Sequence, residues 1–109
     1  MSQLIKLRGL ELSKDKIDDF CRRWKISELA VFGSILRDDF SLESDIDLLV
    51  TFASDAEWSL LDHIRMEEEL ASLFGREVDL VNRRAVEQSE NWIRRREILS
   101  TAQAIHVSR

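Results

Sequence analysis

The chain has 109 residues, a length that predicts one domain over residues 1–109. It contains no apolar run near the ~20 residues that a membrane-spanning helix needs. With 44% hydrophobic and 34% charged residues it is typical of a folded domain, and a net charge of −5 argues against a general nucleic-acid binder, because phosphate binding depends on basic side chains. The single cysteine, Cys21, excludes an internal disulfide, and an N-terminus without a signal-peptide pattern predicts a cytoplasmic protein.

Helix and strand patterns alternate along the chain. Ser13 is a candidate N-cap for the first helix, and Gly75 is a candidate stop for a long one. Glu67 interrupts the apolar side of that long helix, which we interpret as an edge position. The expected elements are a helix over 14–25, a strand over 29–32, a short helix with a loop over 34–44, a strand over 45–52, a helix within 54–75, a strand over 77–81, a helix over 83–100, and either a last strand or the end of that helix over 102–107.

Three aspartates carry the first chemical signal. Asp45 and Asp47 stand two residues apart at the start of the second expected strand, so their carboxylates project side by side. Such neighbours repel each other unless a cation lies between them, and an oxygen-only donor set suits Mg²⁺ or Mn²⁺. Asp79 is a lone acid in the third, apolar strand, which is unfavourable without a partner. If the two strands are close, the three acids form a site for two cations, an arrangement used for displacement at phosphorus.

A second signal follows the first expected strand. Gly33 allows a phosphate to approach the backbone closely, and free N–H groups at the start of a short helix at Ser34 attract anions. The Ser34 hydroxyl and the Arg37 guanidinium offer further donors. A Gly-Ser pair alone is typical of a turn, and an Asp-x-Asp pair alone of an exposed strand. Together, a phosphate cradle and an acid pair on consecutive strands predict a nucleoside triphosphate site.

The segments VFGSILRDDFSLESDIDLLVTF and FGREVDLV (residues 31–52 and 74–81) resemble the minimal nucleotidyltransferases of the DNA polymerase β superfamily. The shared pattern is Gly-Ser, ten residues, Asp-x-Asp and a third Asp on a later strand. The resemblance implies an α+β fold with a mixed sheet flanked by helices in the order α-β-α-β-α-β-α, ATP as substrate and two Mg²⁺ ions. Matched position by position, the triphosphate-binding residues are Gly33, Ser34 and Arg37, and the catalytic, metal-binding acids are Asp45, Asp47 and Asp79.

Two positions depart from the family's Gly-Ser-Arg-x-Arg-Gly pattern. Ile35 stands where the first arginine is common, and Asp38 replaces the second glycine. We therefore expect weaker triphosphate binding than is usual in the family. We also expect that an arginine at position 35 would face the phosphates and raise the affinity for ATP.

The same resemblance suggests a partner. Small stand-alone members of this family resemble antitoxins of helical HEPN toxins, which implies transfer of AMP from ATP to a hydroxyl of the toxin, expected to be a tyrosine. Two alternatives stay open: an antitoxin that binds nucleotide without catalysis and blocks its partner by contact, and a transferase that modifies RNA, which the acidic charge disfavours. No membrane partner is expected. Segment 83–109, with Trp92 among polar residues, is where we expect the partner protein to bind. Three alternatives stay open for its arginines: a solvent-exposed helix face, contact with an acidic partner, or contact with ATP phosphate.

Overall fold

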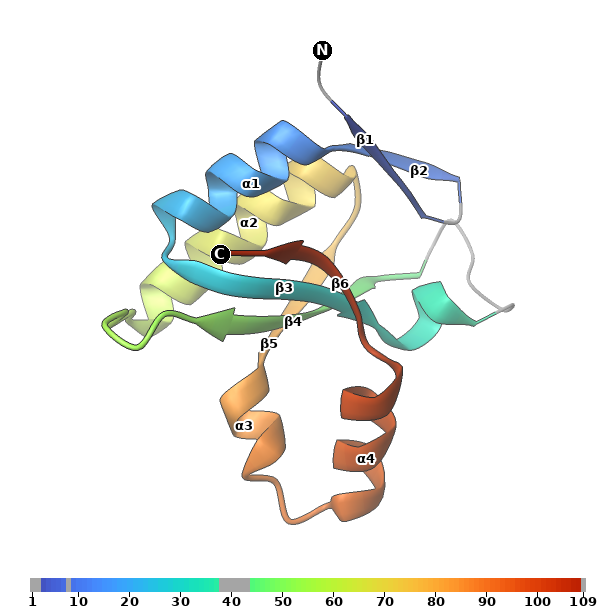
Figure 1. Ribbon diagram of the computed structural model, residues 1–109, viewed down its shortest axis with the longest axis vertical. Helices are drawn as coiled ribbons and strands as arrows, with labels where there is room; N and C mark the ends of the chain where they lie inside the picture. Colours follow the sequence, from blue (N-terminus) through green and yellow to red (C-terminus); the bar gives the residue numbers. More distant parts are fainter. Residues whose placement is uncertain (1–2, 8, 38–43, 109) are drawn as a thin grey trace.

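A four-stranded sheet in the order β5-β4-β3-β6 forms the centre of the molecule (Figure 1). The structure is a computed structural model that describes residues 3–7, 9–37 and 44–108. β3 pairs antiparallel with β4 and with β6, whereas β4 and β5 are parallel, so the sheet is mixed, as the sequence predicts. The strands are β3 (Ile26–Phe32), β4 (Ile46–Phe52), β5 (Val78–Asn82) and β6 (Gln103–Val107).

Helices cover both faces of this sheet (Figure 1). They are α1 (Lys14–Arg23), α2 (Leu60–Phe74), α3 (Arg83–Glu87) and α4 (Trp92–Thr101). α1 and α2 share the larger core with Leu48, whereas Leu49 packs with Val86 of α3 and Ile98 of α4 in a second cluster. Since alternate side chains of a strand point to opposite faces, β4 supplies both cores, and Asp47 falls on the face that α3 and α4 cover. Within the described ranges, no helix is both long and apolar enough to cross a bilayer.

The ends of α2 are set by local chemistry. Ser59 and Asp62 form a capping box, in which Ser59 Oγ accepts from the Asp62 N–H at 3.2 Å and Asp62 Oδ2 accepts from the Ser59 N–H at 2.9 Å. Gly75 ends the helix with a φ of 73°, the left-handed conformation that favours glycine. The chain then turns directly into β5, which lies beside β4.

Three parts of the fold differ from the sequence prediction. An antiparallel hairpin, β1 (Leu4–Leu7) and β2 (Leu10–Ser13), precedes α1 and was not predicted. β3 begins at Ile26, before the expected start at residue 29, because Ile26 and Glu28 pair with β4 and the Ser27 hydroxyl between them donates to the Thr51 carbonyl of β4. The expected helix over 83–100 is two helices.

The break between α3 and α4 has a local cause. Asn91 caps α4, with its side-chain oxygen accepting from the Arg94 N–H at 3.1 Å, so a new helix begins there. Residues 103–107 form a strand, one of the two alternatives that the sequence left open. The expected short helix is present as η1 (Gly33–Leu36), whereas part of the loop expected after it, 38–43, lies outside the described residues.

Candidate functional site

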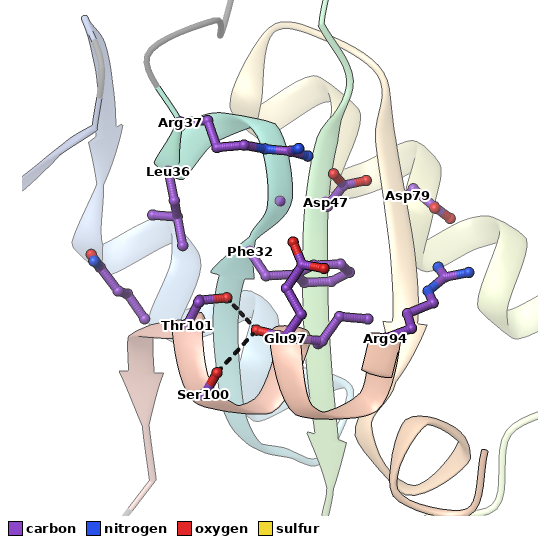
Figure 2. A pocket seen from close by; sticks show the side chains of 12 residues that line it. Phe32, Leu36, Arg37, Asp47, Asp79, Arg94, Glu97, Ser100 and Thr101 are labelled. Carbon is purple, nitrogen blue, oxygen red and sulfur yellow. Dashed lines mark hydrogen bonds between the residues drawn. The ribbon is translucent and has the colours of Figure 1, made fainter. Parts of the chain in front are cut away.

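A pocket of about 610 Å³ lies between η1 and α4, at the end of the sheet where β4 and β5 begin (Figure 2). Pockets for small molecules are typically about 300–1,000 Å³, so the volume suits a ligand of nucleotide size. Ser34 and Asp45 are not among the residues that line it. Of the six site residues predicted from the sequence, those that line the pocket are Gly33, Arg37, Asp47 and Asp79.

Asp47 and Asp79 are register partners on the parallel strands β4 and β5. Paired residues of neighbouring strands share one face of a sheet and lie on strands about 4.8 Å apart, so both carboxylates leave the sheet on the α4 side. In the sequence, 31 residues lie between these two acids, and the fold brings both into one pocket.

The Asp47 carboxyl lies in an unfavourable environment for a negative charge. Burial raises its pKa, and the charges of Asp79 and Asp45 raise it further. A hydrogen bond from the Ser34 backbone N–H and the charge of Arg37 oppose these effects without cancelling them. A carboxylate of this kind gains from a bound cation, and perturbed acids of this kind are concentrated at functional sites.

Gly33 and Ser34 hold η1 against the acids. Gly33 has a φ of 76°, and a Cβ there would overlap Oδ2 of Asp47, so only glycine fits this position. The Ser34 backbone N–H donates to the Asp47 carboxylate, and its Oγ donates to the Asp45 carbonyl at 3.4 Å. The turn therefore positions the acid strand, a role that sequence reasoning had not given it.

Asp45 is placed differently from the other two aspartates. It precedes β4 and is exposed, and its charge reaches Asp47 although it does not line the pocket. Among the residues that the structure describes, no three His, Cys, Asp or Glu side chains are arranged to hold a metal ion. The pair of Asp47 and Asp79 offers carboxylate oxygens only, which suits Mg²⁺, and a three-aspartate site requires Asp45 to turn toward the pocket.

The expectation for Ile35 is wrong. Its side chain is 1% exposed and belongs to the core beneath α1 and α2. Successive residues of a tight helical turn point in different directions, and this one points away from the pocket, so an arginine at position 35 would enter the core. Asp38, the other departure from the family pattern, lies outside the described residues.

Sequence reasoning missed the wall of the pocket that α4 provides. Glu97, Ser100 and Thr101 line the pocket together with Arg94, which had been treated only as part of an arginine cluster. The Thr101 hydroxyl donates to the Glu97 carbonyl at 2.6 Å (Figure 2). The available signal was Ile98, the buried residue of α4, because positions 94, 97 and 101 lie on the same side of a helix as position 98.

Comparisons with known proteins place the chain in a family. Residues 14–105 match the family described as "Nucleotidyltransferase domain". The protein adenylyltransferase MntA of Thermococcus cleftensis is 44% identical over 59 residues, which are 54% of this chain and 58% of that protein. This chain therefore spans less than two thirds of the length of that curated relative.

Two solved structures share the fold. A minimal nucleotidyltransferase is 32% identical, with a TM-score of 0.62 over 83% of this chain and 86% of that chain. A chain from the complex of a tri-AMPylated Shewanella oneidensis HEPN toxin with an MNT antitoxin has a TM-score of 0.57 at 20% identity, over 87% of this chain and 70% of that chain. The family match, the shared fold and the paired acids agree with the sequence motifs, and the chain belongs to the nucleotidyltransferase domain family.

Proposed function

We propose that this protein is a Mg²⁺-dependent nucleotidyltransferase that transfers AMP from ATP to a hydroxyl, expected to be a tyrosine, of a HEPN toxin, and so acts as its antitoxin. The observation that carries the proposal is the pair of Asp47 and Asp79, which face one pocket beside the Gly33 turn. Family membership supports nucleotidyl transfer. The adenylyltransferase relative and the AMPylated toxin complex support AMP as the transferred group and a toxin as the acceptor.

Five of the six predicted site residues have a direct role in this reaction. Asp45, Asp47 and Asp79 are the groups that would hold Mg²⁺, which when bound supplies positive charge against the triphosphate. Arg37 donates to phosphate oxygens, and Gly33 lets the phosphates approach the backbone. The acceptor oxygen forms a bond to the α-phosphorus, the bond to the bridging oxygen breaks, pyrophosphate leaves, and the hydroxyl proton passes to Asp79.

Exposed apolar side chains next to the pocket support a protein acceptor. Trp92 and Ile93 are 59% and 62% exposed at the start of α4, the helix that lines the pocket. Exposed aromatic and aliphatic side chains of this kind are typical of protein interfaces. A toxin that contacts them would lie close to the acids, which is what transfer to its hydroxyl requires.

The test is transfer of a label. The protein is mixed with Mg²⁺, with ATP radiolabelled on its α-phosphate, and with the protein encoded by the neighbouring gene. Label should appear on that protein, and Asp47→Asn should abolish transfer. Asp55→Asn is the matched control, because Asp55 is an exposed acid whose contact with Lys25 is a surface ion pair. Transfer at the wild-type rate by Asp47→Asn would refute the catalytic role.

A contact-only antitoxin is the second candidate. It is favoured by Asp45, which lies outside the pocket, so that the third acid is not in place. This candidate requires neutralisation of the toxin without transfer of label. It also requires that Asp47→Asn neutralises as well as wild type, whereas Trp92→Ala does not.

A further inference from the structure

Arg94, Arg95 and Arg96 are consecutive in sequence but have three different surroundings. Arg95 is half-buried, and its Nη1 donates to the Ser89 carbonyl at 2.9 Å, which closes the turn between α3 and α4. Arg96 is exposed and is not among the residues that line the pocket. Arg94 is the member of the cluster that lines it. The position of α4 on the sheet therefore separates one arginine from its neighbours.

The Arg94 guanidinium is available to a ligand. No residue in the described ranges forms a hydrogen bond or an ion pair with its side chain. A guanidinium keeps its charge at all physiological pH values and presents five N–H donors in a planar fork, which matches the oxygens of a phosphate. In Figure 2 the Arg94 side chain extends from α4, and the Arg37 side chain extends from the opposite wall, next to η1.

The charges of the pocket favour a second guanidinium beside the triphosphate. Asp47, Asp79 and Glu97 line the pocket together with Arg37 and Arg94. Without Arg94, a triphosphate would meet three carboxylates and one guanidinium. Asp47 is the half-buried one of these carboxylates, so its charge is screened least by solvent and would repel a triphosphate most. Ile35 is in the core, so η1 supplies no cation from that position.

We propose that Arg94 binds phosphate oxygens of the nucleotide, so that the triphosphate lies between Arg37 on the η1 wall and Arg94 on the α4 wall. The inference deepens the proposed function and rests on it for the identity of the nucleotide. Arg94 of α4 would then supply the positive charge that an arginine at position 35 supplies in the family pattern.

The experiment is calorimetric titration of the full chain with ATP and Mg²⁺, with Arg94→Gln compared with Arg96→Gln. Arg94→Gln should weaken ATP binding about tenfold, as expected for the loss of one charged hydrogen-bonding partner at an exposed position that lines the pocket. Arg96→Gln removes the same charge from the same helix and should leave the affinity within about twofold, since an exposed charge outside the pocket is screened by salt. Arg94→Lys should retain part of the affinity, because the charge remains and the fork is lost. Both arginines are exposed, so equal melting temperatures are expected for the variants.

Titration with inorganic tripolyphosphate separates this inference from the proposed function. If wild type binds ATP and the two glutamine variants bind it equally well, the role of Arg94 is overturned and the nucleotidyltransferase proposal stands. If wild type binds tripolyphosphate in an Arg94-dependent manner but does not bind ATP, the anion site stands and the nucleotide function falls. Binding of neither compound by wild type overturns both.

Discussion

The carboxylate of Glu67 accepts a hydrogen bond from the backbone N–H of Leu80, with 2.8 Å between Oε2 and N. Leu80 follows Asp79 on β5, the strand at the edge of the sheet. An edge strand presents backbone donors with no partner strand, and here α2 supplies an acceptor for one of them. The interruption of the apolar side of α2 at Glu67 is therefore the point at which the helix holds the edge strand beside the site.

Removal of this hydrogen bond should loosen β5. Glu67→Leu should lower the free energy of unfolding by about 1 kcal/mol, because the Leu80 N–H loses its acceptor in a partly buried position. Glu67→Gln keeps an acceptor oxygen and should cost less. Urea unfolding measures the free energies, and amide hydrogen exchange at Leu80 should be faster in the leucine variant. Equal stability and equal exchange in all three proteins would contradict this role.

The metal-free protein should be more stable without the charge of Asp47. Burial and the neighbouring charges of Asp79 and Asp45 raise the pKa of this carboxyl, so its ionised form destabilises the fold at neutral pH. Asp47→Asn should therefore raise the melting temperature in the presence of a chelator. Asp55→Asn, at an exposed surface position, should leave it nearly unchanged. A lower melting temperature for Asp47→Asn would show that the carboxylate is held by contacts that outweigh the repulsion.

Position 35 should tolerate a smaller apolar side chain but not a charged one. Ile35→Arg places a guanidinium in the core and should cost about 4 kcal/mol or more, since a buried charge without a partner is among the most destabilising changes known. Ile35→Val should cost about 0.5–1.5 kcal/mol, the usual value for one buried methyl group. Thermal unfolding followed by circular dichroism compares them. A folded Ile35→Arg protein with raised affinity for ATP would restore the sequence-based expectation.

The capping box of α2 gives a prediction about pH. Hydrogen bonds from the Ser59 backbone N–H and hydroxyl hold the pKa of Asp62 below its ordinary value of 3.8. A lowered native pKa means that the ionised form stabilises the fold, so the contribution is present above pH 3.8 and is lost as the pH falls through the native pKa. Asp62→Asn should be less stable than wild type at neutral pH, and the difference should shrink in acid. Urea unfolding at neutral and at acid pH measures the difference in free energy of unfolding between the two proteins. A difference that does not change with pH would contradict the stabilising role of the Asp62 carboxylate.

The local parts of the fold could be predicted because neighbouring residues determine them. Strand β4 follows from an apolar run with aspartates at its start, and α2 follows from Gly75 and the apolar positions before it, although its start at the Ser59 cap was not predicted. The earlier start of β3 could not be predicted in this way. Ser27 and Glu28 are polar, and they stay in the sheet because Glu28 pairs with β4 and β6 and the Ser27 hydroxyl donates to the Thr51 carbonyl of β4.

One part of the candidate site could also be predicted from local sequence, and another part could not. The placement of Asp47 follows from strand alternation, and that of Asp79 follows once β5 is placed beside β4. The contribution of Arg94 and Glu97 depends on how α4 lies over the sheet, which is decided by packing of Ile98 against Leu49 and Val86. Burial of Ile35 likewise depends on contacts with distant elements. Three-dimensional packing, rather than local pattern, therefore decides which charged residues reach the pocket.

The order of the strands has a consequence for a chain that is still being synthesised. β6 covers the free edge of β3, and α4, which lines the pocket, directly precedes β6 in sequence. Domains fold as their residues leave the ribosome, and β3, β4 and β5 leave before these two elements. Until residues 92–107 have emerged, β3 presents an open hydrogen-bonding edge to other nascent chains, and such edges promote aggregation. During this interval the edge of β3 is open and the pocket lacks the wall that α4 provides. Both conditions end when the same sixteen residues, 92–107, are added.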